Sequence, residues 1–324
     1  MVLFHNFIPL SNTHSHMLLR QFPNLAEVQK LGNPHLDRTK RPWRNVILNF
    51  KCTEAERKNI ESPYSIFANL KGTSYVGVNG KEHRVESDSF LLTLPGDRYD
   101  LCIDAIEPTE LFNIHINTDF LEQCANGFLI SSNDLIHHNE KAKVSSLLLN
   151  NGHHPKTIQF NQLVESILRF SPEEKIETEH MYTNIVRFLL FQNTANAEKV
   201  AQLPMVKWAV RKEIAQRLES ARDFMYDNYS TTFEIDELCR EIGLSKFHFI
   251  RLFEAYFDCS PYKYLVRIRM QKACELLKNT HLQVNDIAGL VGFEFANSFI
   301  KTFKKQFGST PQQYRNDKMM CAGK

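Results

Sequence analysis

The spacing of apolar residues divides the chain into two parts. Between about residues 44 and 117 apolar and polar residues tend to alternate, as at Val46, Leu48 and Phe50, which is the period of a half-buried β-strand. The dipeptide Asn79-Gly80 lies between two such runs and predicts a hairpin, because both central residues of a type I′ turn need positive φ. Several short strands at this spacing predict an antiparallel sandwich or barrel.

After about residue 157 the apolar residues recur three and four positions apart, which is the spacing of a helix. The segments QFNQLVESILRF and HMYTNIVRFLLFQ each place apolar side chains on one face, so these helices pack on the β-domain or form a dimer seam. We predict a first domain at 1–195, with strands in 44–117 and helices in 157–195. A linker at 196–214, a helical domain at 215–316 and a tail at 317–324 follow.

Composition and charge narrow the function classes. The 324 residues include 39 basic, 37 acidic and 43% hydrophobic residues, which is typical of a globular chain. A net charge of +2 excludes binding to nucleic acid through bulk charge, so such binding needs a local basic patch. Residues 244–278 carry seven basic and three acidic residues, whereas 234–243 carry one and four. The basic character is confined to particular helices, and a solvated helix face is the plainer interpretation of it.

The compartment is indicated by what the sequence lacks. The seven cysteines form neither a disulfide framework nor a CxxC motif, a usage typical of a reduced, intracellular protein. The first twenty residues lack the basic and apolar regions of a signal peptide. Nowhere do apolar residues approach the ~18 consecutive positions of a membrane span. We therefore expect a soluble, cytoplasmic protein with no membrane partner.

An internal repeat carries most of the functional information. The segment IDELCREIGLSKFHFIRLFEAYFDCSPYKY at 235–264 resembles VNDIAGLVGFEFANSFIKTFKKQFGSTPQQY at 284–314, once one residue is inserted in the second turn. The aligned pairs include Gly243 and Gly292, Phe249 and Phe299, Phe253 and Phe303, Pro261 and Pro311, and Tyr264 and Tyr314. One supersecondary unit therefore occurs twice in the chain.

Each repeat predicts a short helix, a sharp turn and a second helix. Gly243 and Gly292 stand where the first helix ends, a position that favours the left-handed conformation of glycine. Ser245 suits the N-cap of the next helix. Two dipeptides suit the N-cap and first position of a further helix, Ser260-Pro261 and Thr310-Pro311. This is the geometry of the helix-turn-helix, and two units could read major-groove faces ~34 Å apart without a dimer. An ordinary helical bundle is the alternative.

Residues 215–316 resemble the DNA-binding domain of the AraC/XylS family of bacterial transcription regulators. The most specific segment is GFEFANSFIKTFKKQFGSTPQQYR at 292–315. The resemblance implies a seven-helix domain with two helix-turn-helix units joined by a long helix. It also implies binding to double-stranded promoter DNA, usually as an activator that contacts RNA polymerase.

On the first recognition helix Lys246, Phe247, Ile250 and Arg251 point outward, and we predict that they contact bases. Arg251 can donate two hydrogen bonds to guanine, and the two apolar residues can pack on thymine methyl groups. The resemblance places Phe247, Ile250 and Arg251 in the groove, although Ile250 departs from the more usual polar residue. Packing against a neighbouring helix or the N-terminal domain is the alternative for the apolar pair.

On the second recognition helix the resemblance places Ala296, Asn297, Ser298 and Lys301 toward the bases. Asn297 suits adenine and Lys301 suits guanine. Phe295 occupies the usual capping position and Ala296 is apolar, so we expect this helix to specify sequence less strongly than the first. The residues predicted to contact phosphates are Ser245, Lys304, Lys305 and Arg315, with plain solvated charge as the alternative for the last three.

The strand-rich part resembles the cupin-like sensing domain of many family members, through the order of SFLLTLPGDRYDL and LFNIHIN. The expected fold class is α+β, with a cupin-like β-barrel or jelly-roll domain and a helical hairpin, then an all-α domain of two helix-turn-helix units joined by a long helix. A small barrel often holds one ligand in its lumen. The candidate lining residues for an unidentified effector are Tyr64, Phe67, Arg98 and Tyr99, which surface or core packing explains equally well.

A metal-dependent cupin-type enzyme fused to a helical domain is the alternative from another class. Such an enzyme needs clustered histidines inside the barrel, whereas the strand region offers only His83 and His115, far apart in sequence. Three histidine pairs lie outside the predicted strands and are expected in solvated loops, His14/His16, His137/His138 and His153/His154. No catalytic motif occurs, so we expect neither enzyme, cofactor nor metal.

The sequence therefore predicts a DNA-binding transcription regulator, an activator that responds to a small-molecule effector bound by residues 1–195. The helices near 160–192 are the candidates for a homodimer seam.

Overall fold

The computed structural model describes residues 16–19, 44–130, 151–169, 175–205 and 207–322. The chain forms two compact units, residues 1–198 and 199–324. The range predicted as a linker, 196–214, contains the end of α4 (Lys175–Gln202) and the start of α5 (Trp208–Asp227). Its polar stretch consists largely of alanine, glutamate, lysine and glutamine, which are good helix formers, so the helix continues through it.

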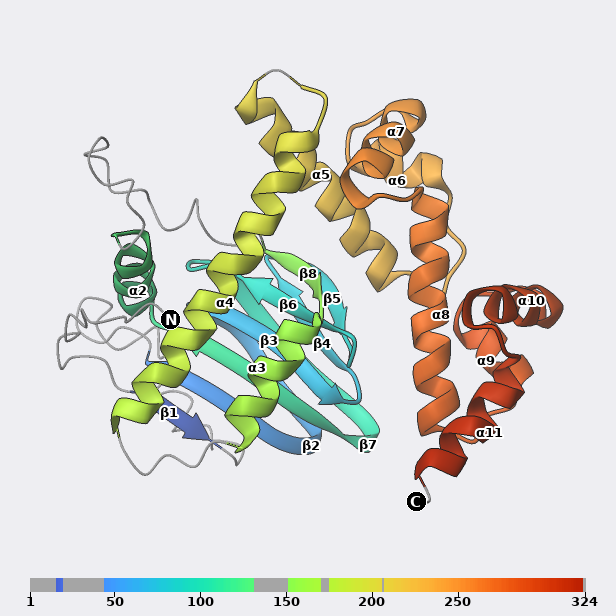
Figure 1. The fold of residues 1–324 in the computed structure, drawn as a ribbon, viewed down its shortest axis with the longest axis horizontal. Helices are drawn as coiled ribbons and strands as arrows, with labels where there is room; N and C mark the ends of the chain where they lie inside the picture. The colour runs from blue at the N-terminus through green and yellow to red at the C-terminus, as the bar shows by residue number, and fades with distance from the viewer. Residues whose placement is uncertain (1–15, 20–43, 131–150, 170–174, 206, 323–324) are drawn as a thin grey trace, which may run out of the picture. The chain divides into compact units, whose positions relative to one another are not determined.

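One curled sheet forms the first unit (Figure 1). Its strands are β1 (His16–Leu19), β2 (Asn45–Glu61), β3 (Tyr64–Lys71), β4 (Ser74–Val78), β5 (Lys81–Val85), β6 (Ser89–Thr93), β7 (Arg98–Ile116) and β8 (Gly152–Pro155). The order across the sheet is β1-β2-β7-β3-β6-β8, and β4 pairs with β5 and β7 off this path. The pairs are antiparallel except for β1 with β2. Three helices accompany the sheet, α2 (Thr118–Ile130), α3 (Ile158–Arg169) and α4.

The hairpin predicted at Asn79-Gly80 joins β4 to β5. Asn79 has φ 51° and Gly80 has φ 86°, as the central residues of a type I′ turn require. Val78 and Lys81 close the hairpin as the last aligned pair of the two strands. The local signal in the sequence was sufficient here because the turn is set by two residues alone.

Helices α3 and α4 lie across one face of the sheet (Figure 1). The apolar stripe of α3 is buried through Phe160, Val164 and Ile167. That of α4 is buried in the same cluster, which also contains Ile66 and Ile114 from the sheet. The apolar faces of these helices therefore pack on the β-domain, which was one of the two alternatives, and a homodimer through the helices near 160–192 remains a prediction.

The opposite face of the sheet carries a second apolar cluster, and two of the four predicted lining residues belong to it. Phe67 and Tyr99 meet edge to face, with ring centroids 4.9 Å apart. Tyr64 instead points into the cluster under the helices, because adjacent residues of a strand face opposite sides. Arg98 is half-buried and hydrogen-bonds Asn59, which agrees with the alternative of surface packing for this residue.

The first unit also contains several buried histidines. His115 shares a 2.9 Å hydrogen bond with Ser65 Oγ, and burial lowers the pKa of His115 to about 4, which keeps the ring neutral near pH 7. His153 and His154 were expected in a solvated loop, but they lie buried in β8. His154 stacks on Phe90, and the His153 ring meets that of His83 at 5.4 Å. Of the other two histidine pairs, His14, His137 and His138 lie outside the described residues, while His16 begins β1.

The second unit is helical in all its described elements. After α5 come α6 (Ile235–Glu241), α7 (Lys246–Phe257), α8 (Pro261–Asn279), α9 (Val284–Leu290), α10 (Ala296–Phe307) and α11 (Pro311–Ala322). Helix α11 runs as far as Ala322 into the range predicted as a tail, 317–324. The predicted α+β class, with a curled sheet followed by a helical domain, is confirmed. None of the described helices is long and apolar enough to cross a membrane.

The connection between β3 and β4 generates a prediction on stability. Gly72 has φ 80°, and a Cβ there would lie 2.6 Å from Thr109 Oγ1 and 2.9 Å from Thr109 Cα. Gly80 has a similar φ of 86° but no atom within 4 Å of such a Cβ. We expect Gly80→Ala to cost about 1 kcal/mol through backbone strain, and Gly72→Ala to cost about 2–4 kcal/mol because a clash adds to it. Denaturant unfolding of both variants measures this, and equal losses would contradict the clash.

Candidate nucleic-acid interface

The second unit contains one helix-turn-helix twice, with the same turn geometry in both copies. Gly243 follows α6 with φ 66°, and Gly292 follows α9 with φ 83°. In the first copy the Leu244 amide donates to Cys239 O, and in the second the Phe293 amide donates to Ala288 O. Both hydrogen bonds span five residues, which is the pattern of a Schellman motif. The predicted role of the two glycines is confirmed.

An arginine side chain lies against each of these turns. Arg217 Nη1 donates to Gly243 O at 3.0 Å. Arg269 donates from Nε to Tyr229 O at 2.8 Å and from Nη2 to Thr231 O. A Cβ at Gly292 would lie 2.7 Å from that same Tyr229 O. Glycine is therefore required at the second turn by close packing as well as by its φ.

The helices that follow the turns begin differently. Ser245 caps α7 and accepts a hydrogen bond from the His248 amide. Phe295 holds the N-cap position of α10, where no side-chain cap forms. The predicted Ser260-Pro261 start of α8 is present, with Ser260 accepting from the Lys263 amide. Thr310 and Pro311 begin α11 in the same way, through a hydrogen bond from the Gln313 amide.

Each recognition helix buries one apolar stripe and leaves the opposite face outward. In α7 the buried residues are Phe249, Leu252, Phe253 and Tyr256. In α10 they are Phe299 and Phe303. The two stripes enter separate cores, and α8 contributes Ile268 to the first and Met270 to the second. Residues i, i+4 and i+7 share one helix face, so the buried stripe fixes which side chains point outward.

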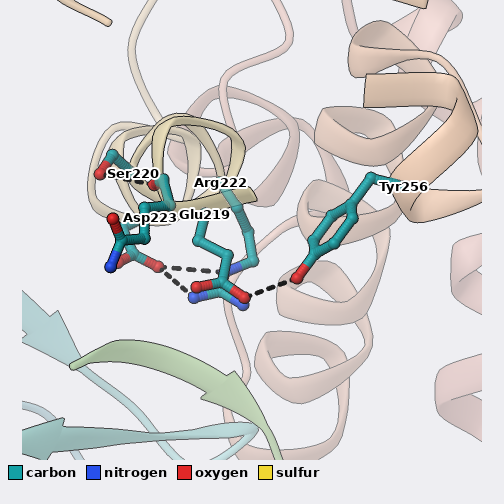
Figure 2. Close-up of polar contacts among 6 residues, drawn as sticks. Glu219, Ser220, Arg222, Asp223 and Tyr256 are labelled. Atoms are coloured by element: carbon teal, nitrogen blue, oxygen red, sulfur yellow. Dashed lines mark hydrogen bonds and ion pairs between the residues drawn. The ribbon is translucent and has the colours of Figure 1, made fainter. Parts of the chain in front are cut away.

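A buried polar contact holds α7 against α5 (Figure 2). Tyr256 Oη donates to Glu219 Oε1 at 2.7 Å, and both side chains are buried. Beside them on α5, Arg222 donates from Nε and Nη2 to Asp223 Oδ1 at 3.0 and 2.8 Å. Burial raises the pKa of Tyr256, and the Glu219 carboxylate raises it further. The phenol therefore remains a donor to Glu219 throughout the physiological pH range.

The residues predicted to contact bases from α7 lie on its outward face. Lys246 and Arg251 are exposed, and the Phe247 side chain is 74% exposed. Ile250 is half-buried and packs against the first core, as the alternative interpretation held. Sequence reasoning missed that Lys246 Nζ forms a 2.9 Å ion pair with Asp236 on α6. The hydrogen bond to Asp236 and its charge raise the pKa of Lys246.

The predicted base contacts of α10 lie together at its start and on its outward face. Asn297, Ser298 and Lys301 are exposed, while Ala296 is half-buried against the second core. Two of the predicted phosphate contacts, Lys304 and Lys305, are exposed one turn further along, and the third, Ser245, is exposed at the start of α7. These exposures leave the predicted contacts accessible to a duplex.

Arg315 is the exception among the predicted phosphate contacts. It is 8% exposed, and its Nη2 donates to Leu282 O at 2.6 Å. This bond ties α11 to the loop between α8 and α9, so Arg315 is held by the domain itself and its burial gives no support to the predicted phosphate contact. The sequence offered no sign of this, because Leu282 lies 33 residues away along the chain.

Comparison with known proteins agrees with this geometry. Residues 238–317 match the family described as a helix-turn-helix domain. The raffinose operon transcriptional regulatory protein of Pediococcus pentosaceus is 30% identical over 33% of this chain and 38% of its own length. The lactose operon transcription activator of Staphylococcus xylosus is 26% identical over 49% of this chain and 56% of its own length. The chain therefore spans only 38% and 56% of the length of these relatives.

A solved structure of a transcriptional regulator from Chromobacterium violaceum, described as having an AraC-type DNA-binding domain, is 27% identical over 32% of this chain and 92% of its own. Its TM-score is 0.31. The helix-turn-helix domain expected from the sequence motifs is confirmed for residues 238–317, and this part of the chain is similar to AraC-type regulators. The curated relatives are transcription regulators.

The contact between Tyr256 and Glu219 generates a prediction. Tyr256→Phe keeps the ring but removes the hydrogen bond to a buried carboxylate, so we expect the free energy of unfolding to fall by about 1.5–3 kcal/mol. Tyr262→Phe is the control, because that tyrosine is 67% exposed on α8. Denaturant unfolding of the two variants measures the difference. An unchanged stability of Tyr256→Phe would show that the contact does not anchor α7.

Proposed function

We propose that this chain is a sequence-specific DNA-binding regulator of transcription, which binds a promoter duplex through α7 and α10. The observation that carries the proposal is the duplicated helix-turn-helix, with the same glycine turn and the same buried stripe in each copy. A helical bundle needs neither the repeated turn nor two exposed second helices. The second helix of this motif enters the major groove, and its N-terminal residues contact base edges.

The charge of the outward faces supports the proposal. Helix α10 contains no acidic residue and exposes Lys301, Lys304 and Lys305. Helix α7 exposes Lys246 and Arg251 against one acidic residue, Glu254. Basic side chains on one face of a helix neutralise phosphates and release counterions, which supplies much of the affinity for DNA. The near-neutral total charge of the chain is compatible with this, because the basic residues are local.

The length of α8 suits simultaneous binding of both helix-turn-helix copies to one DNA duplex. Its 19 residues make it about 28 Å long at 1.5 Å per residue, on the scale of the ~34 Å that separates successive major-groove faces. The apolar residues of α8 enter both cores, so the helix cannot swing freely relative to either helix-turn-helix. We infer that one chain contacts two successive turns of the duplex.

We propose further that the first unit senses a small-molecule effector and that the bound protein contacts RNA polymerase. The names of the relatives, a raffinose operon regulator and a lactose operon activator, support control of transcription. Effector binding would then act as a coupling free energy between the two units. Such a regulator acts in the cytoplasm, where bacterial promoters lie.

A binding titration tests the proposal. The full chain is used to select duplexes from a randomised library, and the affinity for the selected site is measured by fluorescence anisotropy from about 50 to 200 mM salt. We expect a preferred sequence and a steep linear fall of log K with log salt, with a slope of about −0.9 for each phosphate neutralised. Failure to enrich any sequence, or a flat salt response, would overturn it.

Two substitutions separate the two kinds of contact. Arg251→Ala should relax the base preference at one position, at a cost of about 1–3 kcal/mol for the preferred base. Lys304→Ala should weaken binding to all sequences about equally and reduce the magnitude of the salt slope by about 0.9. Parallel selection and salt titration of both variants measure this. An unchanged preference in the first, or a sequence-dependent loss in the second, would show that the roles are assigned wrongly.

A further inference from the structure

Phe295 is the least expected residue on the surface of the second helix-turn-helix. It stands at the N-cap of α10, its side chain is 63% exposed, and it forms no side-chain cap. In the register of the repeat it corresponds to Ser245, which caps α7. The second helix-turn-helix thus carries an exposed aromatic ring where the first carries a capping hydroxyl.

The folded domain gains little from this ring. A serine at the N-cap would satisfy an amide at the start of α10, which phenylalanine cannot do. The neighbouring Phe293 already supplies the apolar contact of the turn, since it meets Phe299 edge to face at 5.6 Å and lies under the Arg269 guanidinium. Phe295 shares in no ring contact among the described residues. Single exposed apolar residues are common on protein surfaces, so what sets Phe295 apart as a candidate contact with a partner is its place at the start of a basic recognition helix.

The surroundings of Phe295 identify the chemistry of that partner. Asn297 and Lys301 are exposed on the same helix, which carries no acidic residue. The corresponding end of α7 also exposes a phenylalanine, Phe247. An aromatic ring at the start of a basic recognition helix suits the floor of a major groove better than an apolar protein surface, because the lysines would be desolvated without partners in the latter.

Within the major groove a phenyl ring has one specific target. It can neither donate nor accept a hydrogen bond, so it cannot distinguish guanine, cytosine or adenine by their polar edges. The C5-methyl group of thymine is the apolar feature of the groove. We propose that Phe295 is a specificity-determining residue, which selects thymine in the second half of the site by packing on this methyl group. The inference rests on the proposed DNA-binding function.

The test removes the methyl group and the ring in turn. Starting from a duplex selected by the full chain, each thymine is replaced singly by deoxyuridine, which lacks the methyl group but pairs identically. We expect wild-type affinity to fall about four-fold at one position, which corresponds to one buried methyl group. Phe295→Ser should bind the unmodified site more weakly and lose this sensitivity. Phe247→Ser, which removes the exposed ring at the start of α7, should lose sensitivity at a different thymine about one helical turn away.

Folding is followed separately, because a merely structural role would change stability and not base preference. We expect Phe295→Ser to unfold at the same temperature as the wild type or a higher one, since the new hydroxyl can cap α10. The inference is overturned if no deoxyuridine substitution weakens wild-type binding in the second half-site, or if Phe295→Ser keeps the same sensitivity. If the chain selects no sequence at all, the proposed function fails and this inference fails with it.

Discussion

The burial of one aromatic stripe in each helix-turn-helix is the constraint on which the proposed DNA-binding surface depends. Phe249 and Phe253 in α7, and Phe299 and Phe303 in α10, are each exposed by less than 1%. Because a helix has a fixed period, burying these side chains determines which residues face outward. The orientation of Arg251 and Lys301 is therefore set by the cores beneath them and needs no contact from the ligand. Polar contacts, such as that of Tyr256 with Glu219, add to this apolar packing and fix the position of α7 against α5.

The two cores are separate clusters, and α8 is the element that belongs to both. A shared rigid helix makes the spacing of the recognition helices a property of the fold. This distinguishes the arrangement from a dimer of single units, in which a flexible or rotating interface sets the spacing. The cost is that every base pair inserted between the two half-sites must be accommodated by bending the DNA or by releasing one helix.

The parts of this account that could be predicted from sequence are those that depend on local signals. The glycines at 243 and 292, the Ser-Pro and Thr-Pro helix starts and the Asn-Gly hairpin are fixed by two or three neighbouring residues. The burial of Arg315 and the Lys246–Asp236 ion pair could not be predicted in this way, because each depends on a partner brought close by folding. The same holds for His153 and His154, since β8 is too short to show a periodic pattern and is held by pairing with β6. The sequence indicated that Phe295 stands at a capping position without a capping side chain. That its ring is exposed could be learned only from the structure.

Changing the spacing between the two half-sites tests the central claim, that one chain holds two recognition helices at a fixed separation on one duplex. Affinity is measured for the selected site and for sites with 5 or 10 base pairs inserted between the halves. A rigid α8 predicts a loss of about 100-fold or more for both insertions, because the second helix can no longer engage together with the first. Restoration of full affinity at 10 base pairs, or no loss at either length, would contradict the account.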